Sequence, residues 1–256
     1  MKKYKISTSY KHKAVLWLSL GVCVILTAIF LYIFWPHTNE TIINQQSAKE
    51  DLTPSPIISE QTAAQPTPIP DSYDLAIPYA PQAPFSNWTV HEESCEEAAT
   101  YMYRAYLEEL NYPNGRIPDT GADTAFRAMK AWQVTNYGKE PDLTMTALGT
   151  FAQSYYGYTP TVEKNITEDD IKKAISDGHP VVVPVMTHSL ENNMYGPISV
   201  YHVLLIKGYD ATGVITNDAG VGNGVNKHYN WNVLWQAIDA QKAKMGQGRE
   251  LLYLTK

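Results

Sequence analysis

The longest apolar stretch of the chain lies near its N-terminus, at residues 14–35, where AVLWLSLGVCVILTAIFLYIFW carries no charge. As a helix, this stretch would cross the roughly 30 Å hydrocarbon core of a bilayer. Lysines precede it, and this excess of positive charge predicts an N-terminus that stays in the cytoplasm. We therefore predict a cytoplasmic basic tail at 1–13, a single-pass signal anchor in the cell membrane at 14–35 and an extracytoplasmic remainder. A cleaved signal peptide would have a shorter apolar region ending in small residues, whereas this one ends in YIFWPH.

The segment after the predicted anchor has a different composition. Residues 36–72 include DLTPSPIISEQTAAQPTPIPD, which is rich in Pro, Thr and Ser and poor in large apolar side chains. Such a stretch cannot bury enough apolar surface to fold and is predicted to be a disordered linker. The folded domain is therefore expected to cover residues 73–256.

The first half of this domain shows the spacing of amphipathic helices. Apolar side chains recur every three or four residues after Cys95, which predicts a helix over about 95–111. Ser94 and Glu97 have the spacing of a capping box, which would make Cys95 the first helical residue. Further helices are predicted at about 121–134, 144–155, 167–177 and 230–241.

The second half contains short apolar or β-branched runs bounded by turn residues. These runs predict strands at 179–186, 202–210, 213–218 and 251–255. The second and third strands are joined by DATG, a hairpin-like turn. Helices followed by an antiparallel sheet predict an α+β fold.

Composition and motifs exclude several classes of function. The chain has 20 basic and 26 acidic residues, which argues against a nucleic-acid binder. No HExxH, paired CxxC or EF-hand spacing occurs, so we expect neither a metal nor another cofactor. The GVGNG stretch at 220–224 lacks the strand–turn–helix setting of a dinucleotide loop and suggests a turn or the rim of a site.

The chain has two cysteines, Cys23 in the predicted anchor and Cys95 in the folded domain. A single cysteine in an exported domain pairs with another molecule, is a reactive thiol or is a buried apolar residue. The first turn of a helix favours the thiolate, because unpaired N–H groups and the helix dipole stabilise negative charge. Nearby glutamates oppose this effect, and the sequence leaves the outcome open; they are Glu92, Glu93, Glu96 and Glu97.

A base for this thiol is sought among the histidines of the folded domain, which are His91, His179, His188, His202 and His228. His202 opens an apolar strand, where it is either a core histidine or a functional one. The hairpin would bring Asn217 or Asp218 near it. A carboxylate accepting the Nδ1 proton of the imidazole would fix its orientation, the third role in a nucleophile–base–orienter set.

The stretches IPYAPQAPFSNW, SCEEAA, YHVLLIKGYD and ITNDAG, in this order, resemble papain-like cysteine peptidases related to the bacteriocin-processing peptidases of family thirty-nine. The resemblance runs from about Ala76 to the C-terminus. It implies a papain-like fold with Cys95 as nucleophile, His202 as general base and acid, Asp218 as orienter and Gln82 as oxyanion donor. Glu96 and Ala219 depart from the family pattern, which often has Gly after the nucleophile and Pro after the Asp.

The resemblance implies a cysteine peptidase that acts on a peptide or protein, including a cell-wall peptide. A peptidoglycan amidase or endopeptidase with the same triad is an alternative, as are a non-catalytic binding module and a purely structural role for the cysteine. No nucleic-acid partner is expected, and the sequence does not indicate the oligomeric state. Specificity depends on loops such as 111–122 and 187–200, whose shape the sequence does not give.

Overall fold

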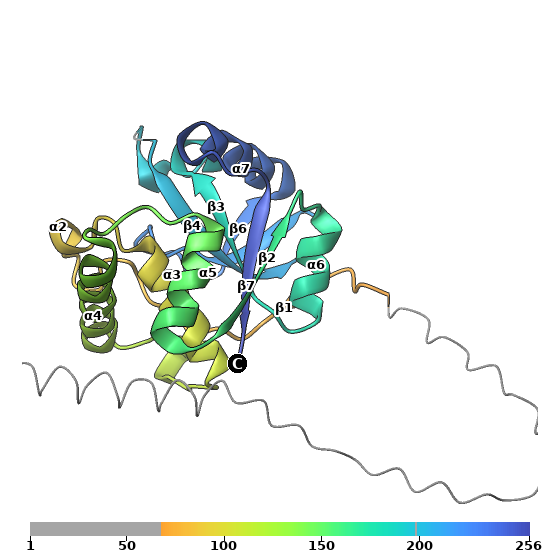
Figure 1. Cartoon of the computed structure of the whole chain (residues 1–256). Helices are drawn as coiled ribbons and strands as arrows, with labels where there is room; N and C mark the ends of the chain where they lie inside the picture. The colour runs from red at the N-terminus through yellow and green to blue at the C-terminus, as the bar shows by residue number, and fades with distance from the viewer. Residues whose placement is uncertain (1–67, 198) are drawn as a thin grey trace, which may run out of the picture. The chain divides into compact units, whose positions relative to one another are not determined.

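The computed structural model describes residues 68–256 apart from residue 198 (Figure 1). The predicted segments 1–13 and 14–35, and most of the predicted linker 36–72, lie outside the described residues. None of the helices in the described part of the chain combines the length and apolarity that a membrane crossing requires.

One antiparallel sheet forms the centre of the described region. Its strands are β1 (Tyr73–Asp74), β2 (Thr159–Lys164), β3 (Val181–Met186), β4 (Tyr201–Tyr209), β5 (Gly213–Asn217), β6 (Lys227–Asn230) and β7 (Glu250–Thr255). The strand order is β2-β7-β3-β4-β5-β6, with β1 paired to β4. Every residue of β3 and β4 is buried, because helices cover the middle of the sheet.

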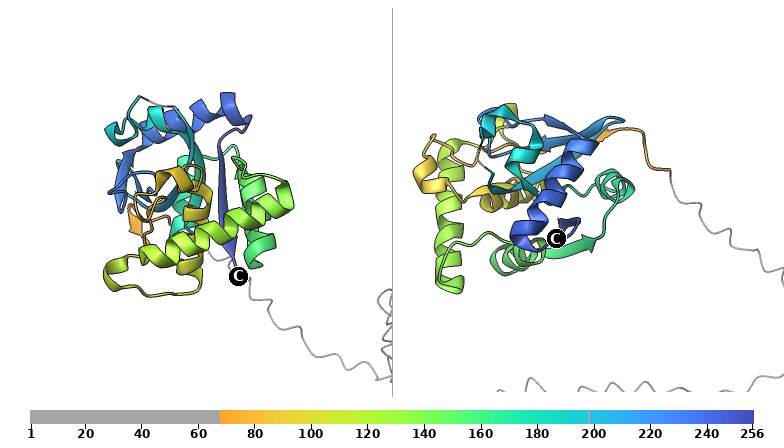
Figure 2. Two further views of the ribbon diagram at one scale, coloured as in Figure 1. Left: turned by 90° about the vertical axis from the view of Figure 1, so that its left-hand side faces the viewer. Right: turned by 90° about the horizontal axis from the view of Figure 1, so that it is seen from above.

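The helices of the described region are α2 (Trp88–His91), α3 (Cys95–Leu107), α4 (Asp119–Tyr137), α5 (Met145–Tyr156), α6 (Glu168–Ser176) and α7 (Trp231–Met245). Short 3₁₀ turns occur at η1 (Pro113–Gly115), η2 (Thr187–Leu190) and η3 (Asn193–Tyr195). α3 packs against β4 on one side and α4 on the other, and Figures 1 and 2 show it between them. The α+β fold predicted from the sequence is confirmed.

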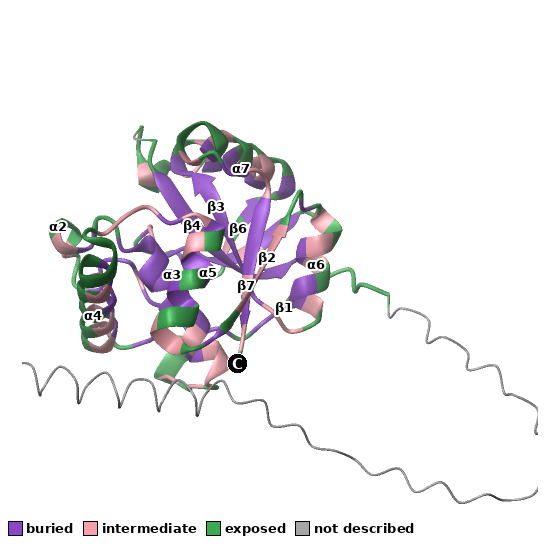
Figure 3. Ribbon diagram, viewed as in Figure 1, coloured by how far each residue is buried: buried purple, intermediate pink, exposed green. Residues whose placement is uncertain are grey.

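The position of α3 explains why it is the most buried helix near the site. Ten of its 13 residues are buried, including Cys95, Glu96 and Glu97, and Figure 3 shows its buried surface. The helix begins at Cys95 as predicted but ends at Leu107, because Glu109 adopts a positive φ of 56°.

The predicted capping box at the start of α3 is wrong. The Ser94 side chain makes no capping hydrogen bond, and its Oγ lies 3.1 Å from Nδ1 of His91. Glu97 instead accepts a hydrogen bond from Gln133 on α4. Because α4 packs over this turn, Glu97 is drawn toward a buried partner rather than back to the start of the helix.

Candidate active site

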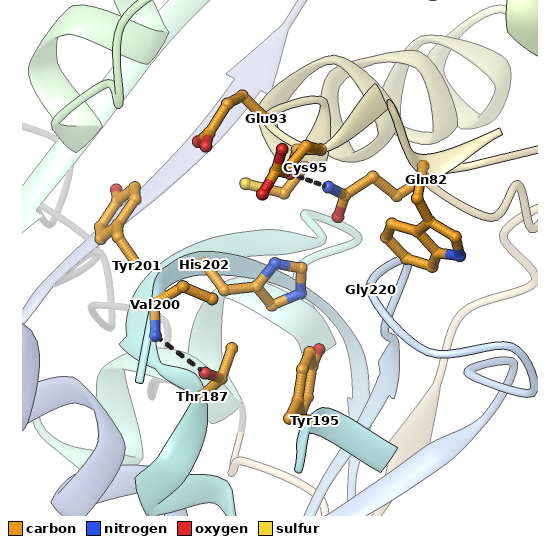
Figure 4. Close-up of a pocket in the computed structure, with 11 residues that line it drawn as sticks. Gln82, Glu93, Cys95, Thr187, Tyr195, Val200, Tyr201, His202 and Gly220 are labelled. Atoms are coloured by element: carbon orange, nitrogen blue, oxygen red, sulfur yellow. Dashed lines mark hydrogen bonds between the residues drawn. The ribbon is translucent and has the colours of Figure 1, made fainter. Parts of the chain in front are cut away.

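Two parts of the chain that are distant in sequence form the walls of one pocket. The pocket is a cavity of about 220 Å³. Its lining includes four residues of the α2–α3 region, five of strand β4 and its flanking segments, and also Gln82 and Gly220; the set is Gln82, Trp88, Glu92, Glu93, Cys95, Thr187, Tyr195, Val200, Tyr201, His202 and Gly220. Figure 4 shows Cys95 and Gln82 across the cavity from His202 and Tyr195. Cys95 lies at the first residue of α3, and His202 is the second residue of β4.

His202 is held by a carboxylate from the loop after β5. Its Nε2 atom lies 3.0 Å from Oδ1 of Asp218, and the two side chains are 4% and 0% exposed. The partner is therefore Asp218 rather than Asn217, whose amide donates to the carbonyl of Ile77 at 3.1 Å. The structure brings His202 and Asp218 together at the pocket, as the sequence analysis expects.

The ring nitrogen that faces the acid differs from the expectation. Asp218 contacts Nε2, not Nδ1, because the carboxylate lies beyond the far edge of the imidazole, in the loop that follows the neighbouring strand β5. This leaves Nδ1, the nitrogen nearer the backbone, free of that partner. The imidazole is thus oriented from its distal nitrogen, and its proximal nitrogen is available to a group on the α3 side of the cavity.

Two tyrosines that the sequence analysis missed bind the same carboxylate. The Tyr195 hydroxyl donates to Oδ1 of Asp218 at 2.6 Å, and the Tyr229 hydroxyl donates to Oδ2 at 2.6 Å. The Tyr195 ring centroid also lies 5.6 Å from that of His202. Burial on its own would raise the Asp218 pKa, but the His202 contact and these two hydroxyls outweigh it and keep the pKa below the ordinary value. Asp218 therefore stays ionised.

Gly220 allows this arrangement to be compact. A Cβ at this position would lie 2.7 Å from the Tyr195 hydroxyl oxygen and 2.8 Å from Cε1 of His202. The Gly220 N–H also donates to Oδ1 of Asp218 at 3.1 Å. At the other end of the GVGNG stretch, the Gly224 carbonyl accepts from the Asp218 N–H at 2.9 Å. This stretch therefore forms a turn that lines the pocket and supports the acid.

Cys95 sits in an environment that favours the neutral thiol. Its side chain is almost fully buried, and its Sγ donates a hydrogen bond to Oε2 of Glu96 at 2.8 Å. Burial raises the Cys95 pKa well above its ordinary value, and the charges of Glu96 and Glu97 raise it further. The N–H of Val203 acts in the opposite direction. The sequence left open whether the helix start or the glutamates prevail; in this structure burial, followed by Glu96 and Glu97, outweighs the helix start and favours the neutral thiol.

Gln82 reaches the pocket on an N-terminal segment that is hydrogen-bonded to the loop after β5. The Gln82 N–H donates to the carbonyl of Ala219 at 2.9 Å. Its side-chain amide nitrogen donates to the carbonyls of His91 at 2.9 Å and Glu92 at 2.7 Å. Both amide hydrogens are thus used to hold the turn before Cys95, and an oxyanion role would require the amide to rotate.

A second histidine fixes the same turn. His91 is fully buried, with Nδ1 at 3.1 Å from Ser94 Oγ and Nε2 at 2.8 Å from Oδ1 of Asp123 on α4. Ser94 is itself buried, and none of the three residues of this serine–histidine–aspartate arrangement lines the pocket that Cys95 lines. It anchors the backbone immediately before the thiol to α4.

A family model and one solved structure show what this chain is similar to. Residues 74–243 match the model of the Peptidase_C39 like family, and the chain belongs to this family of cysteine peptidases. The resemblance predicted from the sequence is confirmed, and with it the papain-like class of fold. A solved structure described as a C39-like peptidase from Bacillus anthracis is 15% identical with a TM-score of 0.35, over 46% of this chain and 62% of that chain. The match thus spans about three fifths of that protein. A search of curated proteins with this chain found no match.

Proposed function

We propose that this protein is a membrane-anchored extracytoplasmic cysteine peptidase that hydrolyses peptide bonds through Cys95, His202 and Asp218. The observation that carries the proposal is the His202–Asp218 contact of 3.0 Å on the wall of the cavity that Cys95 also lines. A thiol, an imidazole and a buried acid arranged around one cavity are the parts of a nucleophilic hydrolase. Family membership supports the same chemistry.

The proposed reaction follows from these positions. His202 takes the thiol proton, and the Cys95 sulfur attacks the carbonyl carbon of the scissile bond to give a tetrahedral oxyanion. The Cys95 backbone N–H stabilises that oxyanion, and Gln82 assists if its amide turns from the two carbonyls it binds. His202 then protonates the leaving amine, and water attacks the thioester to release the second product. Asp218 holds the imidazole throughout and stabilises its charged form.

Substitution of the nucleophile tests this function. Cys95→Ala should abolish hydrolysis of a quenched fluorescent peptide library, and His202→Ala should reduce it by a similar factor, because the two groups act as a unit. Cys23→Ser is the matched control, since it removes the other thiol of the chain and should leave the rate unchanged. Equal hydrolysis by Cys95→Ala and the wild type would refute the proposal.

The substrate class is proposed as a peptide or protein, and the assay can include the cell wall. Running the same variants on purified peptidoglycan separates a peptidase from an amidase or endopeptidase with the same triad. Cleavage of peptidoglycan alone, dependent on Cys95, would replace the peptidase assignment with that alternative.

A non-catalytic binding module is the second candidate, and the buried, protonated state of the Cys95 thiol favours it. Labelling by iodoacetamide distinguishes the two candidates. A rate typical of an unactivated thiol that does not change in His202→Ala would support the binding module.

The anchor at 14–35 is part of the proposal and rests on the apolar run and the lysines before it. The full chain should stay with membranes after alkaline carbonate extraction, and a chain beginning at residue 36 should not. Protease added to the outside of spheroplasts should digest the folded domain. Release of the full chain by carbonate would contradict the anchor.

A further inference from the structure

Glu96 is a buried acid that the triad mechanism does not use. It is 2% exposed and directly follows Cys95 in the sequence. Both of its carboxylate oxygens have partners, since Oε1 accepts from the Leu143 N–H at 2.9 Å and Oε2 accepts from the Cys95 thiol at 2.8 Å. The carboxylate therefore touches the reacting sulfur directly.

We propose that ionised Glu96 is a second hydrogen-bond acceptor for the Cys95 thiol, which competes with His202 for the thiol hydrogen and keeps the nucleophile uncharged until Glu96 takes up a proton from solvent. This inference rests on the proposed function, in which Cys95 attacks the substrate. It makes Glu96 a further catalytic residue of the same site, because its carboxylate accepts a hydrogen bond from the reacting sulfur of Cys95.

The physical argument follows the two charge states of Glu96. When Glu96 is ionised, moving the thiol proton to His202 would place a thiolate beside a carboxylate in a buried site, where charge repulsion is weakly screened. When Glu96 is protonated, its hydroxyl can donate to the sulfur and stabilise the thiolate instead. One proton, taken from solvent by Oε2, thus reverses the direction of the Cys95–Glu96 hydrogen bond.

The surroundings place this change near neutral pH. Burial raises the Glu96 pKa to about 7, although the hydrogen bonds from Cys95 and Leu143 lower it. The charged and titratable groups that act on Glu96 directly are Cys95 and Glu97 on α3, Asp142 in the α4–α5 connection and Tyr201 on β4. Lys130 on α4 and Glu140 act on the neighbouring Glu97, and Lys244 on α7 acts on Glu93 at the pocket.

The two lysines in this set are already paired with other acids. Lys130 binds Glu140 at 2.9 Å, and Lys244 binds Asp142 at 2.9 Å. Glu97, the next residue, is equally buried and is bonded to Gln133 rather than to the thiol. Glu96 is therefore the acid in this group whose contact with the sulfur is direct, and Glu97 provides a matched control.

The test measures the rate of iodoacetamide labelling of Cys95 in the full chain, by mass spectrometry, between pH 5.5 and 9. In the wild type the rate should fall as pH rises through about 7, because ionised Glu96 repels the thiolate and the proton held by His202 returns to the sulfur. A lone thiol would show the opposite trend, since its thiolate increases with pH. A wild-type rate that rises steadily from pH 6 to 8.5 would overturn the proposal without any variant.

The variant arm uses Glu96→Gln, whose amide oxygen can still accept from the Leu143 N–H. Labelling of Glu96→Gln at pH 8 should be at least about tenfold faster than that of the wild type, the effect of one pKa unit, and the fall near pH 7 should disappear. Glu97→Gln should change the rate less and retain the fall. An unchanged or slower rate in Glu96→Gln, or an equal increase in Glu97→Gln, would overturn the direct role of Glu96.

A His202→Ala arm separates this inference from the proposed function. If His202→Ala abolishes fast labelling while Glu96→Gln has no effect, the triad stands and the role of Glu96 is refuted. If labelling of the wild type at every pH is independent of His202, the triad itself fails, and the role of Glu96 as its competitor fails with it.

Discussion

The two tyrosine hydroxyls on Asp218 allow the support of the triad to be tested without changing any of its members. Tyr229→Phe keeps the ring and removes the hydroxyl that donates to Oδ2 at 2.6 Å. Among the described residues, this oxygen accepts a hydrogen bond only from Tyr229. A hydrogen bond to a charged group contributes about 1.5–3 kcal/mol, and leaving a buried charge unpaired costs a similar amount. We therefore expect unfolding to become easier by about 1.5–3 kcal/mol at pH 7.

The same substitution should show a defined pH dependence. The folded-state pKa of Asp218 is below its ordinary value, so its contribution to stability is present above the unfolded-state pKa and is lost as pH falls through the folded-state pKa. Removing a donor raises the folded-state pKa. The penalty in Tyr229→Phe should therefore be full above about pH 5 and should shrink as the pH falls through the ordinary carboxyl range near 4.

Thermal unfolding followed by circular dichroism measures both effects. For a domain of this size the expected loss corresponds to a decrease in Tm of about 3–12 °C. Tyr209→Phe is the control, since its buried ring has a hydroxyl that donates to a neutral carbonyl, that of Pro70, at 3.0 Å. Its smaller loss, about 0.5–1.5 kcal/mol, should be the same at each pH. A Tm for Tyr229→Phe equal to that of the wild type, or a loss that does not change with pH, would refute the reasoning.

Three further substitutions test two other contacts of the structure. Gly220→Ala would press a methyl group against the His202 ring and the Tyr195 hydroxyl. We expect kcat/KM to fall at least about tenfold and the free energy of unfolding to fall by about 1–3 kcal/mol. A kcat/KM equal to that of the wild type would show that the loop moves to accommodate the methyl group. Asp74→Asn removes the charge paired with the buried Lys207 and should lower the free energy of unfolding in urea by about 1–3 kcal/mol. Lys207→Met should leave that free energy nearly unchanged, because it removes the buried charge itself. Equal losses of stability in the two variants would contradict this account of the pair.

The sequence predicts the central strands and the main helices because their residues are apolar at regular spacing. It does not predict β2 or β6. β2, TPTVEK, lies at an edge of the sheet with no fully buried residue and contains a proline, and β6, KHYN, lies at the other edge with one buried residue. Edge strands keep one side exposed, so their residues lack the apolar signal that identifies a central strand.

The residues of the site also fall into some that the sequence predicts and some that it does not. Cys95, His202 and Asp218 could be found from residue type and from resemblance, and the structure places Cys95 and His202 on one cavity, with Asp218 buried in contact with His202. Tyr195 and Tyr229 could not, because a tyrosine in a polar loop or edge strand carries no local sign that its hydroxyl will meet a distant carboxylate. The sequence also does not predict the hydrogen-bond partners of Glu96 and Glu97, because these depend on how α4 and the connection that contains Leu143 pack against α3.

The division of the pocket between two distant segments has a consequence for biosynthesis. The sulfur belongs to a helix formed early in the chain, whereas the imidazole, its acid and both supporting tyrosines come from the last third. A nascent polypeptide that has emerged only as far as the helices carries an ordinary, unassisted cysteine. On the proposed mechanism, the protein cannot digest itself or its neighbours before synthesis is nearly finished.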